Sequence, residues 1–209
     1  MILLDLADAC RKSGLKVVEA QGWRTRGHGS FASVNGIICH HTATAATAPG
    51  DYPSMGIVRD GRSDLEGPLA QLGLGRDGTV YVIAAGVAWH AGATFFQRQD
   101  NWHAIGIEAE HPGVGPWTPE QYAAYVRLVD ALADHYEVPL SNVQGHKEVA
   151  KPLGRKVDPN FDMTAFRQAI QTARRNAEVA RRDGVLKRQI DKARKRIAKW
   201  RAERAELRR

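Results

Sequence analysis

Charge divides this chain into two parts of different character. Residues 164–209 contain 16 Lys and Arg against 5 Asp and Glu, whereas residues 1–163 contain 14 against 18, together with all eight histidines. A segment as charged as the second has too few apolar residues to form a core of its own. We therefore expect one globular domain in residues 1–163, followed by a basic helical tail in residues 164–209 with a separate role.

Hydrophobic patterning predicts an α/β fold for the first part. Two apolar runs are typical of buried strands, a Gly-containing turn indicates a hairpin, and one long segment has apolar residues at helical spacing. The expected elements are strands at 34–41 and 104–109, a hairpin with strands 69–74 and 79–84, and a helix at 119–136 with Thr118 as its N-cap. The predicted architecture is a mixed central β-sheet flanked by helices, with a long loop at residues 43–68.

The basic tail has the composition of a helix. We expect two helices, from about residue 163 to 182 and from about 185 to 209, separated by a break at Asp183-Gly184. In the second helix, apolar residues follow alternating steps of four and three, with Arg204 interrupting the series. These residues are Leu186, Ile190, Ala193, Ile197, Trp200 and Leu207. The spacing is typical of a short coiled coil, so a homodimer through the tail is one hypothesis.

Three residues far apart in the first part could hold a catalytic metal ion. His40 and His41 end the first apolar run, and His146 and Asp158 lie together further along the chain. Two imidazoles and one carboxylate are a ligand set of catalytic zinc sites, which leave a fourth position for water. Because neighbouring side chains on a strand point to opposite faces, only one of His40 and His41 can join such a site.

Three further residues could support hydrolysis beside that metal. Lys156 lies two residues before Asp158, so in an extended segment its ammonium would lie on the same side and could stabilise an oxyanion. Glu108, near the end of the second buried strand, could accept a proton from the attacking water. His90 precedes Ala91-Gly92 and could contact substrate or orient water. The alternatives are ordinary surface charges for Glu108, Lys156 and Asp158 and a structural role for His90.

Four separated segments, ICHHTAT, WHAG, IGIEAE and GHKEVAKPLGRKVDPNFDM, resemble the zinc N-acetylmuramoyl-L-alanine amidases of the type-2 amidase and peptidoglycan-recognition family. The segment GPLAQLGLGRDGTVYVIAAG is similar to endolysins of phages that infect actinobacteria. The resemblance covers roughly residues 20–165. It implies a zinc amidase domain in residues 1–163 that acts on bacterial peptidoglycan, with Zn²⁺ on His40, His146 and Asp158 and with Glu108 and Lys156 as catalytic residues.

Two positions depart from the pattern of that family. Many members have a tyrosine in the strand before the Arg-Asp-Gly turn, where this chain has Ala70 with Gln71 beside it. The role of that tyrosine is then absent or falls to Glu108 or His90. Asp158 stands where some members have a cysteine, and both residue types occur in active enzymes of the family.

The resemblance implies hydrolysis of the amide between N-acetylmuramic acid and the L-alanine of the stem peptide, for lysis of a host cell. The alternative is a peptidoglycan-binding module without activity, which the missing tyrosine favours and the complete ligand set opposes. Binding of nucleic acid would depend on the tail alone, because the first part is acidic. We expect the tail instead to hold the protein to anionic envelope polymers or lipid.

The first residues, MILLDLADACRKSGLKVV, do not have the pattern of a secretory signal. We therefore expect synthesis in the host cytoplasm and action on the cell wall after release by other means. The two cysteines, Cys10 and Cys39, are not in a CxxC pair and predict no disulfide framework.

Overall fold

The computed structural model describes residues 1–96 and 99–207 and contains two compact units, Met1–Arg167 and Gln168–Arg209. The first unit therefore extends four residues beyond the predicted boundary at residue 163. The reason is the first turn of the C-terminal helix. Phe166 is fully buried there with its ring 4.9 Å from that of Phe161, and Arg167 forms an ion pair with Glu148.

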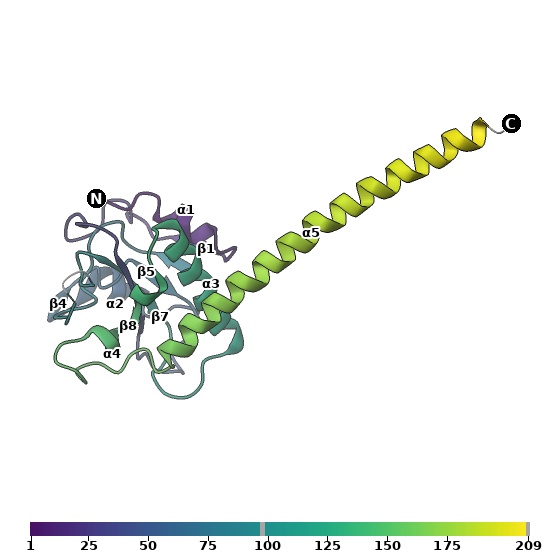
Figure 1. Cartoon of the computed structure of the whole chain (residues 1–209). Coiled ribbons are helices and arrows are strands. Elements are labelled where there is room, and N and C mark those ends of the chain that lie inside the picture. Colours follow the sequence, from purple (N-terminus) through teal and green to yellow (C-terminus); the bar gives the residue numbers. More distant parts are fainter. Residues whose placement is uncertain (97–98, 208–209) are drawn as a thin grey trace. The chain divides into compact units, whose positions relative to one another are not determined.

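The first unit is built around a six-stranded sheet in the order β1-β6-β5-β7-β2-β8 (Figure 1). The strands are β1 (Val17–Glu19), β2 (Gly36–His41), β5 (Leu72–Leu74), β6 (Val80–Val82), β7 (Ala104–Ala109) and β8 (Val143–Gly145). All neighbours pair in parallel except β5 and β6, which form the predicted antiparallel hairpin. The predicted mixed sheet is thus confirmed, although β8 was not expected.

Helices cover both sides of this sheet. Helix α1 (Leu6–Arg11) contacts α3 (Pro119–His135) on one side, and α2 (Met55–Asp60) lies on the other (Figure 1). Helix α3 begins as predicted, because the Thr118 side chain accepts a hydrogen bond from the Gln121 backbone N–H at 3.2 Å. Tyr125 of α3 is fully buried, and its hydroxyl hydrogen-bonds to the backbone of His40 and Ile107 in β2 and β7.

Residues 43–68, expected to form one long loop, contain structure of their own. They include α2 and a two-stranded sheet of β3 (Gly61–Arg62) and β4 (Leu65–Glu66). The segment is fixed to the main sheet by Glu110, which follows β7 and is 1% exposed. The Glu110 carboxylate accepts hydrogen bonds from the Ser54 backbone N–H and from the Ser54 and Thr42 hydroxyls at 3.0–3.1 Å. A buried carboxylate with several donors holds the segment in one position.

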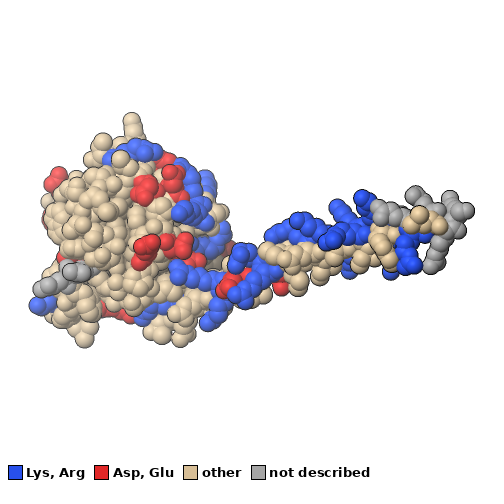
Figure 2. Space-filling view, turned by 45° about the horizontal axis from the view of Figure 1, so that its top comes forward, with Lys and Arg blue, Asp and Glu red and all other residues tan. Residues whose placement is uncertain are grey.

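The C-terminal helix α5 is continuous from Met163 to Glu206, so the predicted break at Asp183-Gly184 is wrong. One glycine costs a helix about 1 kcal/mol relative to alanine, and the surrounding Ala, Arg, Lys and Gln residues are good helix formers. Lys and Arg side chains occupy much of the surface of α5 (Figure 2). Among the described residues, no helix is both long and apolar enough to cross a membrane.

Candidate active site

The candidate site lies where β2, β7, β8 and the segment after α4 (His146–Val149) meet. In the parallel pairing of β2 and β7, Glu108 is directly opposite His40. His146 follows β8 at once, because Gly145 ends that strand beside Cys39 of β2. A side chain at Gly145 would lie 2.9 Å from Pro159 Cδ, so the close approach requires glycine. A hydrogen bond of 2.8 Å from the Lys147 N–H to the Asp158 carbonyl brings the last residue of the site into place.

His40, His146 and Asp158 converge as the sequence predicted. Asp158 Oδ2 lies 3.0 Å from His40 Nδ1 and 3.2 Å from His146 Nδ1. Ligand atoms of the three residues all lie within 4.8 Å of one another, and none of the three side chains is exposed. His41 is not part of this ligand group, although it lines the pocket at which His146 and Asp158 lie.

Hydrogen bonds to the far side of each imidazole fix which nitrogen carries its proton. His146 Nε2 lies 3.0 Å from the Ala91 carbonyl, which can only accept, so Nε2 holds the proton and Nδ1 has a lone pair. His90 Nε2 donates in the same way to the Ala104 carbonyl at 3.1 Å, which makes His90 Nδ1 an acceptor. That acceptor lies 3.2 Å from His40 Nε2, so His40 also presents a lone pair at Nδ1.

The donor set therefore fits a metal cation. Two imidazole lone pairs and a carboxylate oxygen face one another, and none of the three atoms has a proton to share when both rings are neutral. Tetrahedral zinc with bonds of 2.0–2.1 Å would separate its ligand atoms by about 3.3 Å. Asp158 Oδ2 lies 3.0 and 3.2 Å from the two histidine nitrogens, and the three ligand atoms lie within 4.8 Å of one another. The two lone pairs and the carboxylate oxygen repel one another at these distances, and a cation bound between them would attract all three.

The electrostatics of the group agree with this assignment. Burial lowers the pKa of His40 to about 4, so the ring is neutral near pH 7, as a metal ligand must be. Burial alone would raise the pKa of Asp158, but the close approach of the His146 and His40 rings, which favours the charged carboxylate, outweighs that effect and lowers it. An ionised carboxylate is the form in which Asp158 would bind a metal cation.

A pocket of about 740 Å³ opens beside His146 and Asp158, and Glu108 and Lys156 also line it. Glu108 Oε1 lies 3.9 Å from His40 Nδ1, and its buried Oε2 has no hydrogen-bond partner. Burial, with a smaller contribution from the Asp158 charge, raises the pKa of Glu108 to about 8. A cation held by the neighbouring ligands would favour the ionised form. Lys156 is exposed at the pocket, where an ammonium can approach bound substrate.

His90 lines the pocket and is held by contacts with the protein. Both ring nitrogens face protein partners, His40 and the Ala104 carbonyl, so neither remains for a substrate. The backbone around His90 is held by Asn101, whose Oδ1 accepts hydrogen bonds from the N–H groups of His90 and Ala91 at 3.0 and 2.7 Å. We therefore assign His90 to the orientation of His40 rather than to substrate contact.

Some supporting residues had no distinct sequence signal. Asn101 and Arg155 are two of them. The Arg155 guanidinium donates to the carbonyls of Ala91 and Ala93 at 3.0 and 2.8 Å, so it connects the segment that contains Lys156 to the WHAG segment. Ala70 and Gln71, which stand where many family members have a tyrosine, have structural roles in this chain. Ala70 is fully buried, and the Gln71 side chain bonds to the backbone of Gly86 and Gly106. Within the described part of the chain, no tyrosine lines the pocket.

Two imidazoles and a carboxylate that could hold a metal ion, at a pocket lined by a second carboxylate and an ammonium, are suited to hydrolysis. The comparison with protein families identifies the class of bond. The family model of N-acetylmuramoyl-L-alanine amidases (Amidase_2) matches residues 30–161, and the chain belongs to this family.

The chain is also similar to curated relatives. The 1,6-anhydro-N-acetylmuramyl-L-alanine amidase AmpD of Enterobacter cloacae is 36% identical over 104 residues, which cover 47% of this chain and 54% of AmpD. AmpD of Escherichia coli K12 is 37% identical over 101 residues, which cover 46% and 54%. This chain thus spans about half the length of the curated relatives that it matches.

Solved structures share the fold. A selenomethionine derivative of AmpD superposes with a TM-score of 0.55 at 24% identity, over 75% of this chain and 93% of that one. The N-acetylmuramoyl-L-alanine amidase LysC from Clostridium intestinale superposes with a TM-score of 0.57 at 21% identity, over 75% and 97%. At these identities the likeness establishes the common α/β architecture.

Proposed function

We propose that this protein is a zinc-dependent hydrolase of bacterial peptidoglycan that cleaves the amide between N-acetylmuramic acid and L-alanine of the stem peptide. The main supporting observation is the convergence of the His40, His146 and Asp158 ligand atoms, with tautomers set for metal binding, beside Glu108. Membership of the amidase family supports the class of bond, and the names of the relatives support the muramyl–alanine linkage.

In this mechanism His40, His146 and Asp158 hold Zn²⁺, which would lower the pKa of water and polarise the scissile carbonyl. Glu108 Oε2, buried and without a hydrogen-bond partner, accepts the proton of the attacking water and delivers it to the leaving amine of L-alanine. The Lys156 ammonium stabilises the negative charge that develops on the carbonyl oxygen. Because the pocket contains no described tyrosine, Glu108 takes the proton-accepting role alone.

The proposed bond occurs in more than one form of substrate, and the form that the protein cleaves would indicate its biological role. The AmpD relatives are named for 1,6-anhydro-N-acetylmuramyl-L-alanine, whereas one of the similar structures is named an endolysin with N-acetylmuramoyl-L-alanine amidase activity. One form to test is therefore the 1,6-anhydro-muropeptide, and the other is the intact wall. We propose the intact wall, with a role in lysis by an actinobacterial phage, because the segment before and after the Arg-Asp-Gly turn resembles such endolysins. In that role the protein would be made in the host cytoplasm and reach the wall after release.

Digestion of both substrates tests this choice. The purified protein, loaded with zinc, is incubated with intact sacculi and with a soluble 1,6-anhydro-muropeptide, and the products are identified by mass spectrometry. We expect stem peptides with a free L-alanine amine from the sacculi. Cleavage of the soluble fragment alone would favour the AmpD role. Binding to sacculi without cleavage of either substrate would favour the alternative, a recognition module without activity.

A further inference from the structure

The second unit, residues 168–209, presents an apolar stripe that no described residue of the unit covers. Leu186, Ile190, Ile197 and Trp200 are 43–55% exposed. At 3.6 residues per turn these four side chains fall within an arc of about 80° along one face of α5. Large apolar side chains aligned in this way are rare on a helix surrounded only by water, because exposing them to water is unfavourable.

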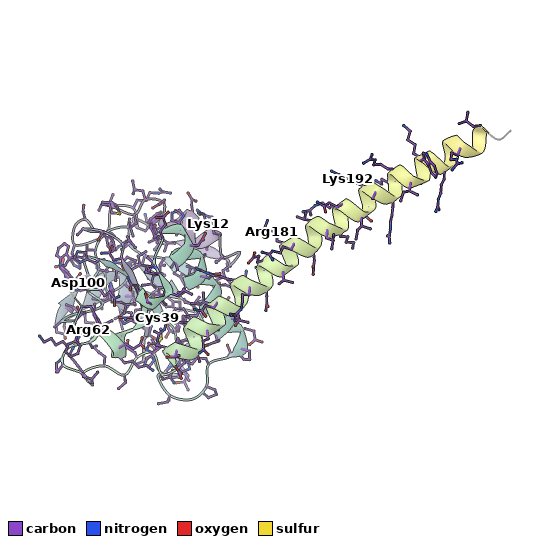
Figure 3. All side chains as sticks on the ribbon, in the orientation of Figure 1. Lys12, Cys39, Arg62, Asp100, Arg181 and Lys192 are labelled. Atoms are coloured by element: carbon purple, nitrogen blue, oxygen red, sulfur yellow. The ribbon has the colours of Figure 1, made fainter. Side chains whose placement is uncertain are left out.

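Basic residues border the stripe on both sides. Residues 184–201 contain eight Lys and Arg and one acidic residue, Asp191. By helical geometry Lys187, Arg194 and Arg201 follow one edge of the stripe, and Arg182 and Arg196 follow the other. Arg181 and Lys192 project outward from elsewhere around the same helix (Figure 3). The face that exposes apolar groups is therefore also strongly cationic.

This charge pattern opposes a second copy of the helix as the occupant. In a parallel coiled coil along the stripe, Arg182 would face Lys187 of the partner and Arg196 would face Arg201. In an antiparallel pair each basic edge would face its own copy. Like charges at the positions that normally form interhelical ion pairs destabilise the dimer, so the seam that the sequence shows needs another occupant.

We propose that α5 docks on an anionic lipid surface, with Leu186, Ile190, Ile197 and Trp200 inserted among the acyl chains and the bordering Lys and Arg at the phosphate level. An apolar stripe with cationic edges matches the two layers of such a membrane. Trp200 is suited to the boundary between them, and the Arg204 guanidinium lies 4.9 Å from its ring centroid. A soluble polyanion such as nucleic acid or a wall polymer would pair with the charges but would leave the stripe in water.

Co-sedimentation of the full-length protein with vesicles tests this proposal. One set of vesicles contains phosphatidylglycerol and phosphatidylcholine, and the other contains phosphatidylcholine alone. We expect binding to the anionic vesicles that weakens as salt rises, since the Debye length falls from about 10 Å at 0.1 M to about 3 Å at 1 M. The double substitution Ile197→Gln/Trp200→Gln should lower this binding by about tenfold or more, because it removes the inserted groups.

Two matched controls separate insertion from general effects. Val114→Gln removes an exposed apolar side chain from the first unit and should leave vesicle binding unchanged. Arg188→Gln/Lys195→Gln removes two charges from the face opposite the stripe and should weaken binding less than Arg194→Gln/Arg201→Gln at its edge. Circular dichroism checks that each variant keeps its helix, and cleavage of a soluble muropeptide reports the proposed activity separately.

Three results would overturn the proposal. Unchanged vesicle binding by Ile197→Gln/Trp200→Gln would show that charge alone is responsible. Tighter binding to purified walls or duplex DNA than to anionic vesicles would identify a different polyanion as the partner. A dimer in sedimentation equilibrium that Ile197→Gln/Trp200→Gln dissociates, with no vesicle binding by the parent protein, would assign the stripe to a second copy.

Discussion

His40 Nε2 lies 3.2 Å from His90 Nδ1, and this contact decides which nitrogen of His40 faces Asp158. The His90 ring is itself fixed by the Ala104 carbonyl, so a chain of two hydrogen bonds runs from the backbone of β7 to the candidate metal ligand. Partners of this kind typically account for about a 10- to 100-fold difference in metal affinity.

We predict that His90→Ala lowers zinc affinity by about 10- to 100-fold, because His40 loses the acceptor that selects its tautomer. His90→Gln should restore part of the affinity, since its amide can accept from His40 and donate to the Ala104 carbonyl. Competition with a chromophoric chelator measures the affinity. Equal loss in both variants, at equal thermal stability of the metal-free proteins, would assign His90 to packing alone.

Removal of a ligand should have a larger effect than removal of its neighbour. His146→Ala and Asp158→Ala should abolish hydrolysis and most zinc binding, because each removes one of three protein ligands. His41→Ala should retain zinc, whereas His40→Ala should not, since only His40 faces Asp158. Metal content by mass spectrometry checks this ranking, and the reverse order would mean that the wrong face of β2 was assigned to the site.

Two variants should separate catalysis from metal binding. Glu108→Gln and Lys156→Ala are each expected to keep bound zinc while activity falls by about a hundredfold or more, the usual effect of losing an acid–base or oxyanion-stabilising group. Turnover of a soluble muropeptide by fully loaded variants is the measurement. Full activity in Glu108→Gln would require another proton acceptor.

The two thiols should be inert in the folded protein. Burial raises the pKa of Cys39 to about 12 and also raises that of Cys10, so at pH 8 both remain protonated, and the thiolate is the reactive form. Cys39 lies inside the first unit (Figure 3). A disulfide reagent should therefore titrate two thiols only after denaturation. Rapid reaction of either thiol at pH 8 without denaturant would contradict the close packing around β2 and α1.

The sequence predicted the parts of the fold that have strong periodicity or turn signals. Strand β7 and helix α3 were located almost residue by residue, because buried parallel strands are continuous apolar runs and Thr118 marks a helix start. The three-residue strand β8 and the six-residue helix α2 were missed, since their conformations depend on pairing and packing with distant residues. The break predicted in α5 was wrong because one glycine is a weak signal against many helix formers.

The sequence predicted which three residues could bind a metal ion, but not the contacts that hold them in position. His40, His146 and Asp158 have metal-binding side chains at spacings that the family resemblance interprets. The contacts of His90, Asn101 and Arg155 connect segments that approach one another only in the folded sheet. No local pattern reports which nitrogen of a histidine is occupied, so the role of His90 became visible only with its two partners in place.

Mass spectrometry of intact sacculi digested with the zinc-loaded protein tests the central claim most directly. The account predicts two products: glycan strands whose lactyl groups carry a free carboxylic acid, and stem peptides with a free L-alanine amine. Neither product should form after chelation of the metal. Cleavage within the glycan or between stem peptides, or release of the same products at full rate by His146→Ala, would contradict it.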